Sequence, residues 1–154
     1  MNEHSPVDLG ELFATMDVAK AFSQPDQLEI AKCLELCSRK KGEPVLLQGD
    51  EGSFLAFIAE GSAGITKDIS HTRDAEVFTV NKGGHFGELS MIDGKPRSAS
   101  VVALEDLTLL CLSRENLDAL ARHSPETAYK LLLELMKSLS LRLRDTTHEL
   151  VFKV

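Results

Sequence analysis

The chain has 154 residues, of which 43% are hydrophobic and 27% are charged, and its formal net charge is −7. This length and composition fit a single soluble domain with a buried core, and no apolar run approaches the roughly 20 residues that span a bilayer. The acidic balance argues against non-specific nucleic-acid binding, which needs a concentrated basic surface. Because the start of the chain lacks the basic and apolar parts of a signal peptide, we expect a cytoplasmic protein.

Residues 9–33 are predicted to be helical, after an N-terminal arm formed by residues 1–9. The segment Ser23-Gln24-Pro25-Asp26 interrupts the helical pattern and starts a second helical turn. The pattern itself consists of hydrophobic residues at near-helical spacing, namely Leu12, Phe13, Met16, Ala19 and Phe22.

From about residue 34 to residue 112, the sequence consists of short apolar or alternating runs separated by turn residues. Glycines at 49–52 and 61–64 are expected to form two of the turns. About seven or eight strands in a segment of this length are typical of a small barrel or jelly roll. The clearest runs lie at 45–47, 54–58, 75–80, 100–104 and 107–112.

Residues 86–100 contain the side chains expected of a site for a small anion that also carries hydroxyl groups. Gly87 permits close approach of the backbone, and the N–H groups that open the following short helix can point at the anion. Arg97 supplies a permanent planar cation for phosphate oxygens, while Glu88 offers acceptor oxygens for a hydroxyl. The alternative is a surface hairpin in which Glu88 and Arg97 merely pair with each other.

The run Phe86-Gly87-Glu88-Leu89, followed by Pro96-Arg97-Ser98-Ala99, resembles the phosphate-binding cassette of the cyclic nucleotide-binding domain family. That family includes bacterial catabolite activators and kinase regulatory subunits. The resemblance implies that Glu88 holds the ribose 2′-hydroxyl and that Arg97 pairs with the cyclic phosphate. Ser98 and Ala99 would add hydroxyl or backbone N–H donors.

The same resemblance covers most of the chain and implies its fold. It predicts a mainly β domain over residues 10–154, in which an eight-stranded β-roll at about 34–112 follows N-terminal helices. Terminal helices at about 113–150 would close the domain.

The last third of the chain is predicted to form two helices. Ser113 can cap a short helix that ends near His123, and Ser124-Pro125-Glu126 has the residues that open a longer one, which extends to about Leu150. The longer helix carries two apolar stripes on different faces. One of them, which consists of Ala128, Leu131 and Leu135, can pack on the barrel. The other stripe follows a heptad spacing, which favours a helix-mediated homodimer. It consists of Tyr129, Leu132, Met136, Leu139, Leu143, Thr146 and Leu150.

Thr146 and Thr147 resemble the Thr-Ser pair with which the activator family reaches the adenine base, partly across the dimer. If the positions of the long helix are counted from Pro125, the Thr-Ser pair of the activator family instead matches Arg142-Leu143, four residues earlier. A third interpretation is a frayed helix end at which the threonines are solvated.

Other reactive residues form no recognisable catalytic or metal pattern. The cysteines Cys33, Cys37 and Cys111 match neither a disulfide framework nor a metal motif and are expected to fill apolar space. His85 lies beside the cassette and is predicted to be a partly exposed loop residue, and the cluster Arg142–Arg144 is predicted to be a solvated face. Because no nucleophile–base pair or metal-ligand set is visible, we expect no enzyme and no catalytic cofactor or metal.

The sequence therefore favours a cyclic nucleotide receptor that acts through its C-terminal helix on an effector protein. Ser98 follows the arginine as in bacterial activators that bind cyclic AMP, so cyclic AMP is favoured over cyclic GMP as the ligand. The sequence stops at Val154 without the winged helix-turn-helix of catabolite activators, so DNA binding is not expected. Membrane insertion is not expected either, because no apolar run is long enough to span a bilayer. The alternative is an interaction or dimerisation module that keeps the fold but needs no ligand.

Overall fold

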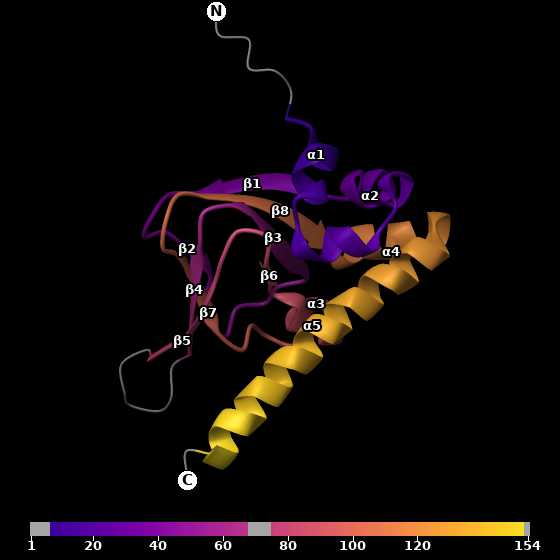
Figure 1. Ribbon diagram of the computed structural model, residues 1–154. Coiled ribbons are helices and arrows are strands. Elements are labelled where there is room, and N and C mark those ends of the chain that lie inside the picture. The colour runs from indigo at the N-terminus through magenta and orange to yellow at the C-terminus, as the bar shows by residue number, and fades with distance from the viewer. Residues whose placement is uncertain (1–6, 68–74, 153–154) are drawn as a thin grey trace, which may run out of the picture.

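The computed structural model describes residues 7–67 and 75–152, except for the side chains of 75–77 and 146–152. Two four-stranded antiparallel sheets form a β-roll, with strand orders β1-β8-β3-β6 and β2-β7-β4-β5. This architecture confirms the predicted eight-stranded roll with flanking helices (Figure 1). The strands are β1 (Glu35–Arg39), β2 (Pro44–Leu46), β3 (Phe54–Glu60), β4 (Ala63–Lys67), β5 (Ala75–Val80), β6 (His85–Phe86), β7 (Ser100–Ala103) and β8 (Leu107–Ser113).

Strand β3 reads as a continuous apolar run because both of its faces are buried. Leu55 and Phe57 belong to the hydrophobic cluster that the helices cover. Ala56 and Ile58 belong to a second cluster, which fills the space between the two sheets. Since side chains alternate across a strand, β3 joins the two parts of the core and fixes the helices to the roll.

The predicted helical stretch at 9–33 consists of three short helices, α1 (Leu9–Ala14), η1 (Asp17–Ala21) and α2 (Gln24–Ala31). Helix α2 begins where the sequence indicated a new turn, because the Ser23 Oγ accepts a hydrogen bond from the Asp26 N–H at 3.4 Å. Of the predicted N-terminal arm, residues 1–6 lie outside the described residues, and Leu9 already belongs to α1.

The predicted turn at 61–64 is wrong in its second half. Gly61 has a φ of +92° and does turn the chain, but Gly64 lies inside strand β4. A Cβ atom added to Gly64 would stand 3.3 Å from the Leu104 side chain, which is a tight contact. Gly64 therefore allows close packing within the sheet and does not mark a loop.

Two helices close the domain, α4 (Arg114–His123) and α5 (Pro125–Phe152). The Ser113 Oγ caps α4 as predicted, accepting from the Asn116 N–H at 3.0 Å. The predicted inner stripe of α5, Ala128, Leu131 and Leu135, is buried in the helix-covered cluster. Beyond this contact, α5 runs past the short helix α3 (Glu88–Asp93) toward the C-terminus (Figure 1).

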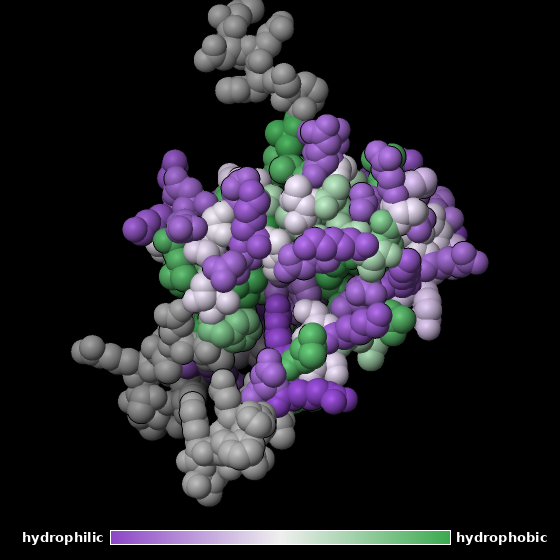
Figure 2. All heavy atoms as spheres, in the orientation of Figure 1, coloured by the Kyte–Doolittle hydropathy of each residue, from purple (hydrophilic) through white to green (hydrophobic). Residues whose placement is uncertain are grey.

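Hydrophilic residues cover most of the face in Figure 2, where the hydrophobic areas are small and separate. Among residues 7–67 and 75–152, no helix has both the length and the hydrophobicity required to cross a membrane.

Candidate ligand-binding site

The segment between β6 and β7 contains the predicted cassette residues. Gly87 connects β6 to α3 and has a φ of +88°, a conformation that glycine adopts without the strain that other residues incur. A Cβ atom at this position would stand 3.0 Å from both the Arg97 Nη1 and the Phe54 carbonyl oxygen. Gly87 thus lets the backbone approach the arginine closely.

Arg97 is a buried cation held by backbone groups. Its side chain is 4% exposed, and Nη1 donates to the Gly87 carbonyl while Nη2 donates to the Phe54 carbonyl, both at 2.9 Å. Its Cζ lies 4.7 Å from the centroid of the Phe54 ring. The Nε is buried and has no hydrogen-bond partner among the described residues. Burial lowers the pKa of Arg97, but a guanidinium stays protonated in proteins.

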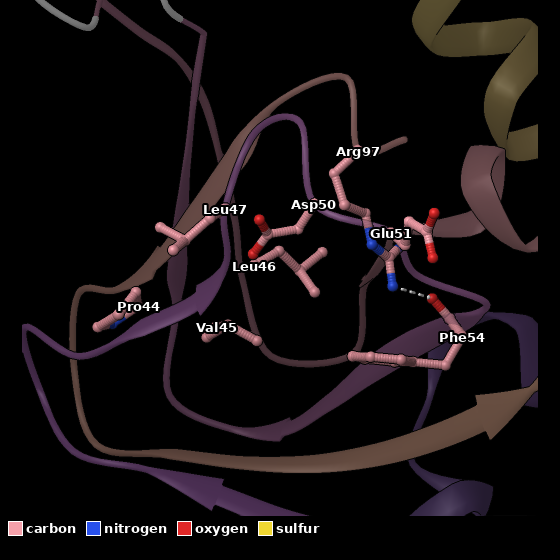
Figure 3. Close-up of a pocket in the computed structure, with 8 residues that line it drawn as sticks. All are labelled: Pro44, Val45, Leu46, Leu47, Asp50, Glu51, Phe54 and Arg97. Carbon is pink, nitrogen blue, oxygen red and sulfur yellow. Dashed lines mark hydrogen bonds between the residues drawn. The ribbon is translucent and has the colours of Figure 1, made fainter. Parts of the chain in front are cut away.

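A pocket of about 240 Å³ opens beside Arg97. Figure 3 shows Arg97 and Phe54 at one end of it and Pro44 and Leu47 at the other. Glu88 is not among the lining residues, so the pocket reaches the predicted phosphate-binding side chain but not the predicted ribose-binding one. The lining residues are Pro44, Val45, Leu46, Leu47, Asp50, Glu51, Phe54 and Arg97.

Gly52 packs directly against the guanidinium of Arg97. A Cβ atom added to Gly52 would stand 2.3 Å from the Arg97 Nε, much closer than real contacts allow. The loop also follows the backbone of Arg97, since the Arg97 N–H donates to the Asp50 carbonyl at 2.8 Å and the Gly49 N–H donates to the Arg97 carbonyl at 2.9 Å. The β2–β3 loop therefore holds Arg97 in place.

Glu88 is 2% exposed and lies between two cationic or potentially cationic groups. The Arg142 Nη1 donates to its Oε1 at 3.0 Å, and the His85 Nδ1 lies 3.1 Å from the same oxygen. Burial is the largest influence on Glu88 and opposes ionisation, but His85, the Glu88 backbone N–H and Arg142 together hold the pKa of Glu88 below its ordinary value.

The structure contradicts one alternative and two expectations about this site. Glu88 and Arg97 form no ion pair with each other in the part of the chain that the structure describes, because Glu88 pairs with Arg142 and Arg97 binds carbonyl groups. His85 is a buried residue of strand β6 and not a partly exposed loop residue. The expectation of a solvated face at Arg142–Arg144 holds for the exposed Arg144 but not for Arg142, which is half-buried and reaches both Glu88 and the backbone of β6. The one sequence signal for a role of Arg142 at this site was the alternative match of the activator family's Thr-Ser pair to Arg142-Leu143.

The other predicted site residues lie in different surroundings. Phe86 is buried between the two sheets, Ala99 is partly buried against the same cluster, and Ser98 is exposed. Leu89 is also exposed, so its side chain is not brought together with those of Glu88 and Arg97. Thr146 and Thr147 lie in α5, but their side chains fall outside the described residues.

The three cysteines lie in partly buried positions. Cys33, Cys37 and Cys111 are free, and among the residues searched no group of three or more His, Cys, Asp or Glu side chains could hold a metal ion. Burial, together with the neighbouring Cys37, raises the pKa of Cys111 to about 12, so this thiol stays protonated at neutral pH. Cys37 and Cys111 pack against the cluster between the sheets, as expected of space-filling residues.

Comparison with known proteins gives a consistent result. Residues 36–124 match the family described as cyclic nucleotide-binding domain. The chain is 34% identical over 129 residues to the cyclic AMP receptor protein of Thermus thermophilus, an alignment that covers 82% of this chain and 57% of that protein. It is 32% identical over 93 residues to the cAMP-dependent protein kinase type II regulatory subunit of Drosophila melanogaster, covering 60% of this chain and 24% of that protein.

Among solved structures, a cyclic nucleotide-binding domain from Methylobacillus flagellatus superimposes with a TM-score of 0.84 at 29% identity, covering 95% of this chain and 82% of that one. The chain spans less than two thirds of the length of the curated relatives named above.

Proposed function

Because this chain belongs to the cyclic nucleotide-binding domain family, we propose that it is a receptor for a cyclic nucleotide, with cyclic AMP preferred over cyclic GMP. The observation that carries the proposal is the state of Arg97. This cation is buried at the wall of a pocket, makes no ion pair among the described residues, and has a buried Nε without a partner there.

A cyclic phosphodiester carries one negative charge and can serve as the anionic partner of Arg97. Burying a cation costs free energy unless an anion or several hydrogen bonds compensate for the loss of water. A guanidinium has five N–H donors, and carbonyl groups take two of them here. The two carbonyls fix the orientation of the guanidinium, and its remaining donors can bind the phosphate oxygens of a nucleotide.

We assign the ribose 2′-hydroxyl to Glu88, whose carboxylate has acceptor positions besides those that Arg142 and His85 use. Since Glu88 is buried and the pocket does not reach it, the surroundings of Glu88 must rearrange when the ribose binds. The pocket is also smaller than the roughly 300–1,000 Å³ typical of ligand sites. The group that can move is Arg142, whose side chain is 32% exposed.

This arrangement gives a route from the ligand to a partner. A shift of Arg142 alters the contact between α5 and the cassette, so nucleotide binding changes the position or order of the C-terminal part of α5. We propose that an effector protein responds to this change. Thr146 and Thr147, one turn beyond Arg142, would then contact the base.

The heptad stripe of α5 supports a homodimer as the signalling form. Met136 and Leu143 are 65% and 68% exposed, and Tyr129 is also exposed, while Leu132 and Leu139 are half-buried. Hydrophobic side chains at this spacing are expected to pack against a second α5.

Calorimetry and thermal unfolding with cyclic AMP, cyclic GMP and non-cyclic AMP test the proposal. A ligand at a hundred times its dissociation constant should raise the free energy of unfolding by about 2.7 kcal/mol. We expect this effect with cyclic AMP, a smaller effect with cyclic GMP at equal concentration, and none with AMP. A preference for cyclic GMP would overturn the choice of base, and no effect with any cyclic nucleotide would overturn the receptor.

The second candidate is a ligand-independent interaction module, favoured by the fact that Glu88 already has partners and is closed off from the pocket. For such a module, dimerisation would persist and would not change when cyclic nucleotides are added. Measuring the oligomeric state with and without cyclic AMP distinguishes the two candidates.

A further inference from the structure

His85 is a buried polar residue with no role in the function proposed above. It precedes Phe86 on β6, and because Phe86 faces the space between the sheets, His85 faces the opposite side. The ring is 2% exposed and lies opposite Phe57 of β3, edge to face, with the ring centroids 5.9 Å apart. A phenylalanine would fill the same space without burying polar atoms, so packing alone does not account for a histidine.

The polar surroundings of His85 are few and specific. In the part of the chain that the structure describes, the charged groups facing it are Glu88 from α3 and Arg142 from α5, while β3 presents the uncharged ring of Phe57. The His85 Nδ1 lies 3.1 Å from the Glu88 Oε1, and the Arg142 Nη1 lies 3.0 Å from the same oxygen. The Arg142 Nη2 donates to the His85 carbonyl at 2.7 Å.

Both ring nitrogens of His85 are buried, and neither makes a hydrogen bond of good geometry with the described residues. The Nδ1 is nevertheless within ion-pair distance of Glu88, so a small rotation of either side chain completes that bond. Buried polar atoms left unpaired are uncommon in native proteins and call for an explanation. Among the described residues, the acceptor that lies 3.1 Å from the Nδ1 is the carboxylate to which we assign the ribose.

We propose that His85 is a positioning residue for ligand binding: its Nδ1–H orients the Glu88 carboxylate and keeps it ionised, so that Glu88 can accept the ribose 2′-hydroxyl. This inference rests on the proposed function, because it concerns the same carboxylate. The direction of the Glu88 pKa agrees with it, since burial opposes ionisation and His85 is the largest of the influences that favour it. With Arg142 on the same oxygen, His85 restrains the carboxylate from a second side.

Two substitutions separate positioning from packing. His85→Phe keeps a ring against Phe57 but removes the donor. His85→Asn removes the ring but retains a donor, because the Asn side-chain nitrogen is as many bonds from Cα as the imidazole Nδ1. A packing role predicts that His85→Phe is the milder change, whereas positioning predicts that His85→Asn is the milder one.

The first measurement needs no ligand. Carboxyl titration of Glu88 by carbon-13 NMR should show a higher pKa for Glu88 in His85→Phe than in the wild type. The pKa of Glu88 in His85→Asn should stay closer to the wild-type value. An unchanged titration of Glu88 in His85→Phe would overturn the positioning role.

The second measurement compares cyclic AMP with 2′-deoxy-cyclic AMP by calorimetry. Weakening a hydrogen bond to a charged group should lower the affinity of His85→Phe for cyclic AMP about tenfold. The affinity for the 2′-deoxy analogue should change by less than about twofold, since the hydroxyl through which His85 acts is missing. His85→Asn should recover most of the affinity for cyclic AMP.

Equal losses for the two nucleotides in His85→Phe would show a general structural effect and overturn the inference. Wild-type protein that binds neither nucleotide would overturn the proposed function. In that case the titration of Glu88 alone decides whether His85 orients this carboxylate. The two failures are therefore distinguishable.

Discussion

Arg142 and Glu88, which are 54 positions apart in the sequence, form an ion pair in which the Arg142 Nη1 lies 3.0 Å from the Glu88 Oε1. The Arg142 side chain also donates to the His85 carbonyl, and its Cζ lies 5.3 Å from the centroid of the Phe78 ring. Helix α5 is thus joined to the cassette, to β6 and to β5 through one side chain. The carboxylate at this junction is the one to which we assign the ribose.

Replacing Arg142 should disconnect α5 from ligand binding. In the wild type, cyclic AMP is expected to slow amide exchange in the cassette and also around residues 140–150. In Arg142→Ala, the slowing should be confined to the cassette. Arg144→Ala is the matched control, because Arg144 is an exposed arginine on the same helix. Protection of α5 that is the same in Arg142→Ala and in the wild type would contradict the relay.

Arg97→Ala should weaken cyclic AMP binding at least about thirtyfold, because losing one partner of a desolvated charge pair costs roughly 2–5 kcal/mol. Arg97→Lys should also weaken binding, since the ammonium lacks the planar fork of the guanidinium. Calorimetry measures both effects, and circular dichroism checks the fold. The exposed Arg122 provides the control Arg122→Ala. If Arg97→Ala binds cyclic AMP with wild-type affinity, Arg97 does not bind the phosphate.

Gly52→Ala tests the position of the guanidinium without altering its charge. The new Cβ would stand 2.3 Å from the Arg97 Nε, so either the guanidinium or the loop must shift, and the loop no longer holds the guanidinium as in the wild type. Displacing one charge-assisted hydrogen bond should weaken cyclic AMP binding about tenfold. Ser53→Ala, at the neighbouring exposed position, should bind like the wild type. Titrations in which the two variants behave alike would show that the loop does not position Arg97.

Glu88 should make the ligand-free protein less stable in acid. Its pKa is lowered in the folded state from an ordinary value of 4.5, so its ionised form contributes stability above that value. This contribution should be lost as the pH falls through the lower pKa of the folded state. Urea unfolding between about pH 3 and pH 7 should therefore show a weaker acid dependence for Glu88→Gln than for the wild type. The exposed Glu126 gives the control Glu126→Gln, and identical pH profiles for Glu88→Gln and the wild type would contradict this role.

A charge on the heptad stripe of α5 should disrupt the homodimer. Met136→Glu places a carboxylate at an exposed seam position, where a dimer would bury it unpaired. Sedimentation should show a dimer dissociation constant at least about tenfold higher than that of the wild type. Leu141 is equally exposed but lies outside the stripe, so Leu141→Glu is the matched control. If both variants stay dimeric, another surface forms the interface.

The sequence predicted the elements whose signals are local. The alternating run at 75–80 coincides with β5, and the capping serine at 113 does begin α4. Gly87 was expected only to permit close approach of the backbone, and its φ of +88° is a finding of the structure. The resemblance to the family then gave eight strands, a number that the local patterns had left at seven or eight, while the order of the strands comes from the structure alone.

The burial of His85 and the position of Gly64 depend on residues far away in the sequence, so local patterns did not predict them. His85 looked like a loop residue because Gly83 and Gly84 precede it and a glycine follows it shortly, yet pairing of β6 with β3 buries its ring against Phe57. Gly64 looked like part of a turn, but it pairs with Thr79 of β5 and Val102 of β7 and so belongs to β4.

The sequence by itself determined which side chains the cassette contains and where α2 and α4 begin, because side-chain caps depend on neighbours along the chain. Only the tertiary structure decided their partners. The sequence offered an ion pair between Glu88 and Arg97 only as the alternative to ligand binding. In the structure the packing of α5 brings Arg142 to Glu88, and the β2–β3 loop closes on Arg97 at Gly52. The physical reason is that a buried charge takes the partner that packing brings within reach, and packing depends on segments far apart in the chain.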